Sequence, residues 1–210
     1  MPFLNNLEQG SEAWLQARRG LITGSRFRDA RDKLKSGAPS KASIAYAYDL
    51  ARERCGGLSP AKFQNAAMRA GTEQEPRARA MYEARTGYMV DKVGFFATDD
   101  ARFGLSPDGL IDEDGVLEIK TIVSSDVLFS VVTEGDLSAY MDQCMGYLWL
   151  LGRQWVDLAI WLPDLDHMVI HRINRDEDAI ERLEADLLQF AAVVASHETK
   201  LRAALDLQPA

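Results

Sequence analysis

The fold is decided by Ser106-Pro107-Asp108-Gly109-Leu110 and by Leu117-Glu118-Ile119-Lys120. The two segments are joined by Asp112-Glu113-Asp114-Gly115, which contains an Asp-Gly turn signal, so residues 108–112 and 116–122 are expected to form a β-hairpin. Strand alternation places Glu118 and Lys120 on one face and their apolar neighbours on the other. Such a hairpin would bring Asp108 beside Glu118.

Two carboxylates and an ammonium on one sheet surface favour a site for a hard divalent cation, Mg²⁺ or Mn²⁺. The cation would polarise a scissile phosphate and lower the pKa of a bound water. Lys120 would position or deprotonate that water, or stabilise the developing charge. The alternative is a hairpin whose solvent face happens to carry charged side chains, and further features are needed to decide between them.

Two helices supply further candidates. Glu75, in Gly71-Thr72-Glu73-Gln74-Glu75, is a possible additional carboxylate or a solvated helix residue. Gln143 and Tyr147 are four residues apart on a strongly apolar helix, hence on one face. A glutamine there is expected to be buried with a partner or to point into a site. Tyr147 fits core packing equally well.

The hydrophobic pattern predicts one α/β domain over residues 1–210, with a helical part over about 1–87, a β-rich core over about 88–173 and a helix over about 176–204. Pro76 predicts a kink or break in its helix. Helices are expected over a short segment capped by Ser11, from Ser25 towards Lys35, and over 41–54, 64–86, 138–151 and 176–204; strands are expected over 88–96, 101–105, 108–112, 116–122, 154–162 and 167–173.

The charge of the chain is unevenly distributed. The 210 residues carry a net charge of −8, which taken alone argues against a nucleic-acid partner. Residues 16–41, however, hold eight basic and two acidic residues, a local charge of +6 against −14 elsewhere. This segment fits either a solvated helix face or a surface that attracts phosphate, because electrostatic fields are local.

The remaining composition narrows the class of protein. No window approaches the roughly 18 apolar residues of a membrane span, and the first residues lack the pattern of a signal peptide. Two widely separated cysteines argue against a disulfide framework. We therefore expect a cytoplasmic protein with no membrane partner.

The order of these motifs along the chain resembles the order found in a known family of proteins. Ser-Pro-Asp-Gly followed by Glu-Ile-Lys is similar to the PD-(D/E)xK nuclease core, and Gln143-x-x-x-Tyr147 resembles its accessory motif. Together with residues 14–25, 71–75 and 140–143, they resemble the phage-lambda-type alkaline exonucleases, or YqaJ-like viral recombinases. The resemblance covers roughly residues 8–200 and implies a restriction-endonuclease-like core, a central mixed β-sheet flanked by helices.

The resemblance also implies roles for individual residues. Asp108, Glu118 and the main-chain carbonyl of Ile119 would be metal ligands, and Glu75 would complete the metal site. Lys120 would be the catalytic lysine, and Gln143 would orient near the catalytic groups.

Other residues match the family's contacts with a DNA end. Arg18, Ser25 and Ser106 match positions that grip a terminal 5′-phosphate, and Met68 falls where such enzymes place an apolar wedge. The family's acidic position upstream of Ser106 corresponds to either Asp99 or Asp100.

The activity implied is a Mg²⁺-dependent 5′→3′ exonuclease, with Mn²⁺ as a substitute, that degrades one strand of linear duplex DNA to mononucleotides. It would leave a 3′ single strand for a single-strand annealing protein, in a bacterial or phage-infected cell, and work as a homo-oligomer, a ring trimer by resemblance. Alternatives are a PD-(D/E)xK endonuclease or repair nuclease, and a non-catalytic DNA-end-binding adaptor. An iron–sulfur repair nuclease would need about four cysteine ligands.

Overall fold

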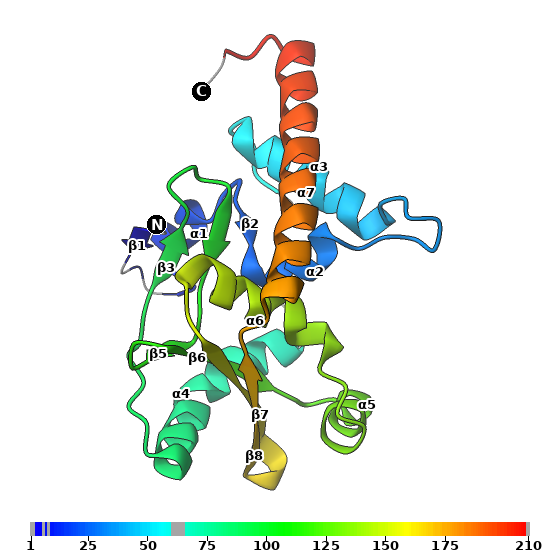
Figure 1. Cartoon of the computed structure of the whole chain (residues 1–210). Coiled ribbons are helices and arrows are strands. Elements are labelled where there is room, and N and C mark those ends of the chain that lie inside the picture. The colour runs from blue at the N-terminus through cyan, green and yellow to red at the C-terminus, as the bar shows by residue number, and fades with distance from the viewer. Residues whose placement is uncertain (1–2, 6, 8, 60–65, 209–210) are drawn as a thin grey trace. The chain divides into compact units, whose positions relative to one another are not determined.

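The structure is a computed structural model that describes residues 3–5, 7, 9–59 and 66–208 (Figure 1). Chain contacts divide it into two compact units, each assembled from separated stretches of sequence. Unit 1 comprises residues 1–61, 94–106 and 176–210, and unit 2 comprises residues 62–93 and 107–175. The single-domain organisation stays a prediction.

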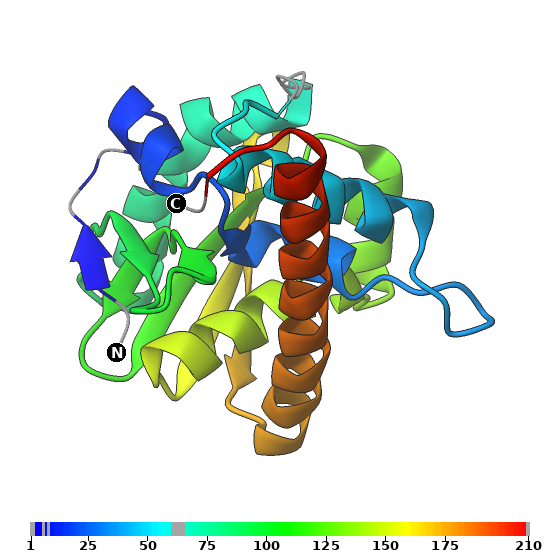
Figure 2. The ribbon, with the colours of Figure 1, turned by 90° about the horizontal axis from the view of Figure 1, so that it is seen from above.

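Unit 1 contains a four-stranded mixed sheet in the order β1-β3-β4-β2, in which β2 and β4 are parallel. Its long helix α7 packs against α3, and Figures 1 and 2 both show the two helices crossing. The elements are β1 (Phe3–Asn5), α1 (Glu12–Ala17), β2 (Ile22–Thr23), the 3₁₀ helix η1 (Gly24–Arg26), α2 (Phe27–Ala30), α3 (Lys41–Arg54), β3 (Phe95–Ala97), β4 (Phe103–Leu105) and α7 (Glu177–Ala204).

Unit 2 contains a second mixed sheet in the order β5-β6-β7-β8, in which β6 and β7 are parallel. The elements are α4 (Ala66–Thr86), β5 (Gly109–Ile111), β6 (Gly115–Thr121), α5 (Ser125–Leu128), the π-helix η2 (Phe129–Thr133), α6 (Ser138–Leu151), β7 (Trp155–Leu162), the 3₁₀ helix η3 (Pro163–Leu165) and β8 (His167–Asn174). The predicted α/β class with mixed sheets flanked by helices is confirmed.

The sheet of unit 2 is covered on both faces. Ala78 and Tyr82 of α4 pack against Leu117 and Ile119 of β6, within one buried apolar cluster. Glu118 and Lys120 alternate to the opposite face, where α6 supplies their partners. The sheet thus packs one face under α4, where Tyr82 also donates a hydrogen bond to the buried Asp157, and directs Glu118 and Lys120 towards α6.

The predicted hairpin is confirmed, with Gly109 paired to Leu117 and Ile111 to Gly115. Its turn residue with positive φ is Asp112, at 46°, rather than the glycine. Gly115 instead starts β6 against Trp155, where a Cβ would come within 2.3 Å of the indole ring. The glycine is therefore required by close packing and not by turn geometry.

Several other expectations hold for the helices. Ser11 caps α1 by accepting a hydrogen bond from the Trp14 N–H, and α3 has the predicted bounds. The periodic apolar residues of α7 are all buried: Ile180, Leu183, Leu187, Phe190 and Val194.

Two expectations are wrong. Ser25 does not cap a helix running towards Lys35, because it lies inside η1 and α2 ends at Ala30. Only the end of the predicted strand 88–96 is in a sheet strand; Asp91 forms an isolated bridge to Leu110. A break at Pro76 is also absent: helix α4 continues through this residue, because the packing of its apolar face outweighs the lost hydrogen bond. The alternative expectation, a kink at Pro76, stays a prediction.

Candidate active site

The β5–β6 hairpin fixes Asp108 beside Glu118 by two hydrogen bonds. The Asp108 N–H donates to the carbonyl of Leu117 at 3.1 Å, and the Ile119 N–H donates to Asp108 Oδ2 at 2.6 Å. The side chain of Asp108 is therefore held against the backbone of the strand that carries Glu118. The predicted proximity of the two carboxylates is confirmed.

Glu118 is 3% exposed and binds three side chains. Lys120 Nζ lies 2.7 Å from Glu118 Oε1 and donates to Gln143 Oε1 at 3.0 Å. Gln143 Nε2 donates to Glu118 Oε1 at 2.9 Å, and the hydroxyl of Tyr147 donates to Glu118 Oε2 at 2.6 Å. Gln143, which was expected to be buried with a partner or to point into a site, has hydrogen-bond partners in Glu118, Lys120 and Tyr147. Tyr147 is part of the same network as well as buried.

Helix α4 brings Glu75 and a residue that the sequence did not single out, Arg79. Arg79 Nη2 lies 2.5 Å from Glu75 Oε1 and donates to the carbonyl of Asp108 at 2.8 Å. One guanidinium thus links the helix to the start of the hairpin. The spacing of four residues between Glu75 and Arg79 was the available signal, but such pairs are common on solvated helices.

The carboxylates of Asp108, Glu118 and Glu75 repel one another. Burial, together with the charges of Glu118 and Glu75, raises the pKa of Asp108 well above its usual range, although Lys120 and the Ile119 N–H oppose the shift. A cation placed between these groups would relieve the repulsion. The negative charge of these carboxylates is therefore not fully balanced by the positive groups beside them.

Burial disfavours the charged form of Lys120, but attraction to Glu118 and Asp108 outweighs it and raises its pKa. The side chain is therefore an ammonium at neutral pH, which favours charge stabilisation over proton abstraction among the roles open to it. Burial and the charge of Glu118 also raise the pKa of the neighbouring Cys144 thiol to about 12. That thiol is neutral at neutral pH.

The donor set fits a magnesium ion with few protein ligands. Among the described residues, no three His, Cys, Asp or Glu side chains are arranged to hold a metal ion. Mg²⁺, however, commonly uses one or two carboxylates and keeps several waters. A carboxylate offers about four lone-pair sites; Glu118 uses three of them in the contacts above, which leaves one for a cation.

Unit 1 brings together the residues predicted to hold a terminal phosphate. The Arg18 guanidinium carbon lies 3.9 Å from the centroid of the Trp14 ring, and Trp14 Nε1 donates to Ser106 Oγ at 3.0 Å. Strands β2 and β4 are parallel neighbours, with Thr23 opposite Gly104. Ser25 and Ser106 therefore follow their strands at the same edge of the sheet. The linking role of Trp14 could not be read from its apparent place on a helix.

Part of the basic segment 16–41 is neutralised. Arg31 Nη2 and Lys33 Nζ each lie 2.7 Å from a carboxylate oxygen of Asp186 on α7. Arg26 pairs with Asp29 and its guanidinium carbon lies 4.0 Å from the Tyr46 ring centroid. The local charge available to an anion is thus smaller than the sequence count.

Two predicted assignments gain nothing from the geometry. The side chain of Met68 lies outside the described residues, so its role as a wedge stays a prediction. Asp100 is held in a turn by Thr98 and by Arg102, whose Nε lies 2.5 Å from its carboxylate. The choice between Asp99 and Asp100 stays open.

The hairpin presents Asp, Glu and Lys beside Gln and Tyr from a flanking helix, and the mixed sheets are covered by helices. This combination defines a nuclease of the PD-(D/E)xK type. The protein-family model described as the YqaJ-like viral recombinase domain matches residues 13–154, more than half of the chain. The chain therefore belongs to the YqaJ-like viral recombinase family, as the sequence predicts, and is a nuclease of that family.

Solved structures agree with this assignment. The chain is 33% identical to an alkaline exonuclease from Laribacter hongkongensis, with a TM-score of 0.80 over 94% of this chain and 100% of that chain. A complex of that exonuclease with dAMP gives 32% identity and a TM-score of 0.81, with the same coverage. This similarity favours exonuclease activity.

A phage-related exonuclease from Haemophilus somnus 129PT shares the fold, with 15% identity and a TM-score of 0.67 over 88% of this chain and 96% of that chain.

A search of curated proteins gave no match. In the described part of the chain, no helix combines the length and apolarity that crossing a membrane requires.

Proposed function

We propose that the protein is a metal-dependent 5′→3′ exonuclease that degrades one strand of linear double-stranded DNA to mononucleotides. The 3′ single strand that remains would serve recombination by strand annealing. The observation that carries the proposal is the arrangement of Asp108 beside Glu118, with Lys120 and Gln143 bonded to Glu118. The dAMP bound to the Laribacter relative supports a nucleoside monophosphate as product.

In this proposal Asp108, Glu118 and the carbonyl of Ile119 would hold Mg²⁺, with Mn²⁺ as a substitute. Glu75, which pairs with Arg79 and is not arranged with the other two carboxylates to hold a metal ion, would complete the site by moving when the cation binds. The cation supplies Lewis-acid polarisation of the scissile phosphate. The protein contributes rigid placement: Lys120, Gln143 and Tyr147 bind both oxygens of Glu118, so its carboxylate is held in one orientation. The Lys120 ammonium stabilises the charge that develops on the phosphate.

The direction of degradation would come from Arg18, Ser25 and Ser106. A guanidinium binds a phosphate monoester through two parallel charge-assisted hydrogen bonds, and a terminal monoester offers more charge and more acceptor oxygens than an internal diester. Stacking on Trp14 holds the Arg18 guanidinium in place. A strand end with a 5′-phosphate would therefore be preferred.

We further propose a homo-oligomer, a ring trimer by resemblance to relatives, and a single-strand annealing protein as partner. Basic residues would then need to line only the channel, which reconciles DNA binding with a net charge of −8. An endonuclease or a repair nuclease of the same fold is the second candidate. A non-catalytic adaptor is disfavoured because Asp108, Glu118 and Lys120 are all present.

The proposal is tested by incubating the protein and Mg²⁺ with linear duplexes labelled at either the 5′ or the 3′ end, with a covalently closed circle as control. We expect labelled mononucleotides to be released from 5′ ends first, while the circle stays intact. Cutting of the circle would identify an endonuclease, and release from 3′ ends would contradict the proposed direction.

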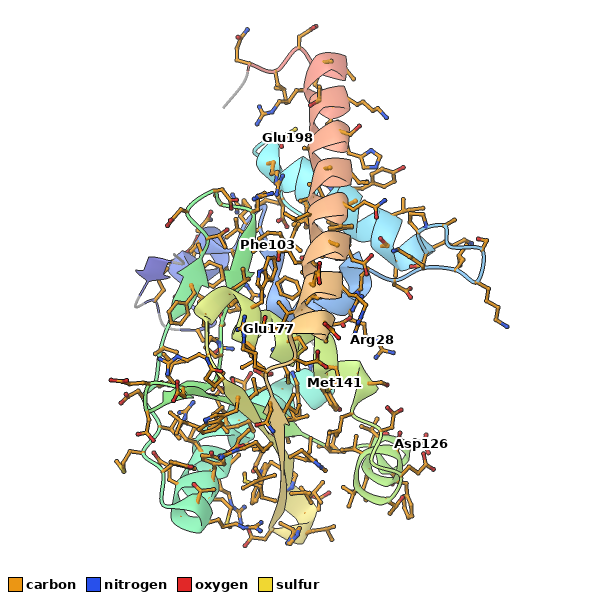
Figure 3. The ribbon with its side chains drawn as sticks, viewed as in Figure 1. Arg28, Phe103, Asp126, Met141, Glu177 and Glu198 are labelled. Carbon is orange, nitrogen blue, oxygen red and sulfur yellow. The ribbon has the colours of Figure 1, made fainter. Side chains whose placement is uncertain are left out.

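Replacing Arg18 with alanine is expected to slow degradation of 5′-phosphorylated ends by about 10- to 100-fold, the value of one or two hydrogen bonds to a charged group. Ends with a 5′-hydroxyl should be degraded at nearly the unchanged rate. Arg28→Ala is the matched control, because Arg28 is exposed on α2 in the same basic segment (Figure 3). Equal loss on both kinds of end would exclude the proposed phosphate contact.

A further inference from the structure

Unit 1 contains a cavity of about 330 Å³ with four arginines in its lining. Arg19 follows α1, Arg54 ends α3, Arg102 lies just before β4, and Arg202 lies near the end of α7. We call this cavity the arginine pocket. None of the four was assigned a role by the motifs of the sequence.

The carboxylates of the pocket neutralise only part of its charge. Asp100 pairs with Arg102 at 2.5 Å, and Glu198 pairs with Arg202 at 2.9 Å. Figure 3 shows Glu198 on the side of α7 that faces the end of α3. Arg54 Nη1 lies 4.0 Å from Glu198 Oε2, at the outer limit of an ion pair. Four guanidiniums therefore face two carboxylates.

Arg54 is the least satisfied of the four. Its Nε donates to the carbonyl of Gly20 at 2.8 Å, but its Nη2 is buried without a hydrogen-bond partner among the described residues. A buried donor without an acceptor is unfavourable. Burial also lowers the pKa of Arg54, in spite of the charge of Glu198. Both observations indicate a missing negative group at this position.

Arg19 is the most available of the four. Its side chain is half-buried and makes no hydrogen bond or ion pair within the described part of the chain. It directly follows Arg18, so the pocket begins one residue from the group proposed to hold the terminal phosphate. An arginine with its guanidinium unused beside a buried one is suited to bind a single phosphate from two sides.

We propose that the arginine pocket binds an internal phosphate of the DNA backbone, a contact separate from the terminal 5′-phosphate. The choice of DNA as the source of the phosphate rests on the proposed function. Because an internal phosphate occurs in any duplex, the contact should need neither a 5′-phosphate nor a divalent cation. It would add affinity that does not depend on sequence.

The test measures duplex binding by fluorescence anisotropy in EDTA, with a 5′-hydroxyl duplex, over a series of salt concentrations. For wild type, the logarithm of the binding constant falls linearly with the logarithm of salt, by about 0.9 for each phosphate contacted. We expect Arg19→Ala to reduce this slope by about 0.9. Arg28→Ala removes the same charge from an exposed position and should leave the slope unchanged.

An unchanged slope for Arg19→Ala, or an equal change for Arg28→Ala, would overturn the proposal. A second arm titrates inorganic phosphate and dAMP while following thermal unfolding. If these ligands stabilise wild type but not Arg19→Ala and the duplex slope is unaffected, the pocket takes a free phosphate or nucleotide, and the backbone assignment is wrong.

The proposed function can fail separately, since cleavage is not measured in EDTA. Wild-type protein that degrades DNA from 5′ ends while Arg19→Ala keeps the full slope would refute the pocket alone. A reduced slope in a protein that never cleaves DNA would refute the exonuclease alone.

Discussion

Replacing Lys120 with alanine will slow DNA cleavage by about 1,000-fold, within the range found for a group that stabilises transition-state charge or transfers a proton. Duplex binding should change little, because the lysine is one of many cationic contacts. The expected cause is loss of the ammonium that lies 2.7 Å from Glu118 Oε1. Single-turnover rates at saturating protein, with binding measured by anisotropy in EDTA, separate the two effects.

Lys92→Ala is the matched control for this substitution, because Lys92 is an exposed lysine of the same unit. Thermal unfolding of both variants checks that the fold is retained. Gln143 and Tyr147 still bind Glu118 when the lysine is removed, so we expect the variant to fold. Full activity of Lys120→Ala would show that the lysine has no catalytic role.

Replacing Asp108 with asparagine will lower activity by about 1,000-fold or more. The substitution removes a proposed ligand of the cation, and a bound cation stabilises the transition state by several kcal/mol as a Lewis acid. The same change should stabilise the metal-free protein. Asparagine retains an oxygen that can accept the Ile119 N–H, yet removes a charge that burial, Glu118 and Glu75 disfavour. Loss of function with gain of stability is typical of a site built for a ligand.

The pH dependence follows from the raised pKa of Asp108. Between the ordinary aspartate range and this raised value, the folded protein binds more protons than the unfolded chain. The free energy of unfolding therefore falls as pH rises through that window and stays lower above it. Asp108→Asn should remove this decline, which thermal melts in EDTA from pH 4 to about pH 8 will measure.

Adding Mg²⁺ should raise the melting temperature of wild type near neutral pH, because a ligand that binds only the folded state stabilises it. The Asp108→Asn variant should respond much less. An equal response of the two proteins would place the cation elsewhere, and a less stable Asp108→Asn in EDTA would contradict the proposed repulsion.

The sequence predicted the parts of the fold that local patterns determine. Alternation within 116–122 correctly placed Glu118 and Lys120 on one face, and the apolar spacing of α7 identified its buried side. Strand 88–96 was overpredicted because its residues satisfy a β pattern without a neighbouring strand along most of their length. The break predicted at Pro76 does not occur, because packing on the sheet maintains the helix.

The candidate site was predictable to the extent that its residues share a hairpin or a helix face. Gln143 could be placed because a polar side chain on an apolar helix needs a partner. Arg79 and Trp14 could not, since their roles depend on contacts with Asp108 and Ser106 that are distant in sequence. The arginine pocket likewise gathers residues from four separated segments, and no local pattern indicates it.

The most direct test of the proposed catalytic centre is the position of a divalent cation in crystals grown with Mn²⁺, located by anomalous scattering. We predict a Mn²⁺ ion bound by the carboxylates of Asp108 and Glu118, at about 2 Å as expected for a hard cation with oxygen ligands, and its absence from crystals of Asp108→Asn. A cation that is bound elsewhere, or that stays in place in the variant, would contradict the assignment.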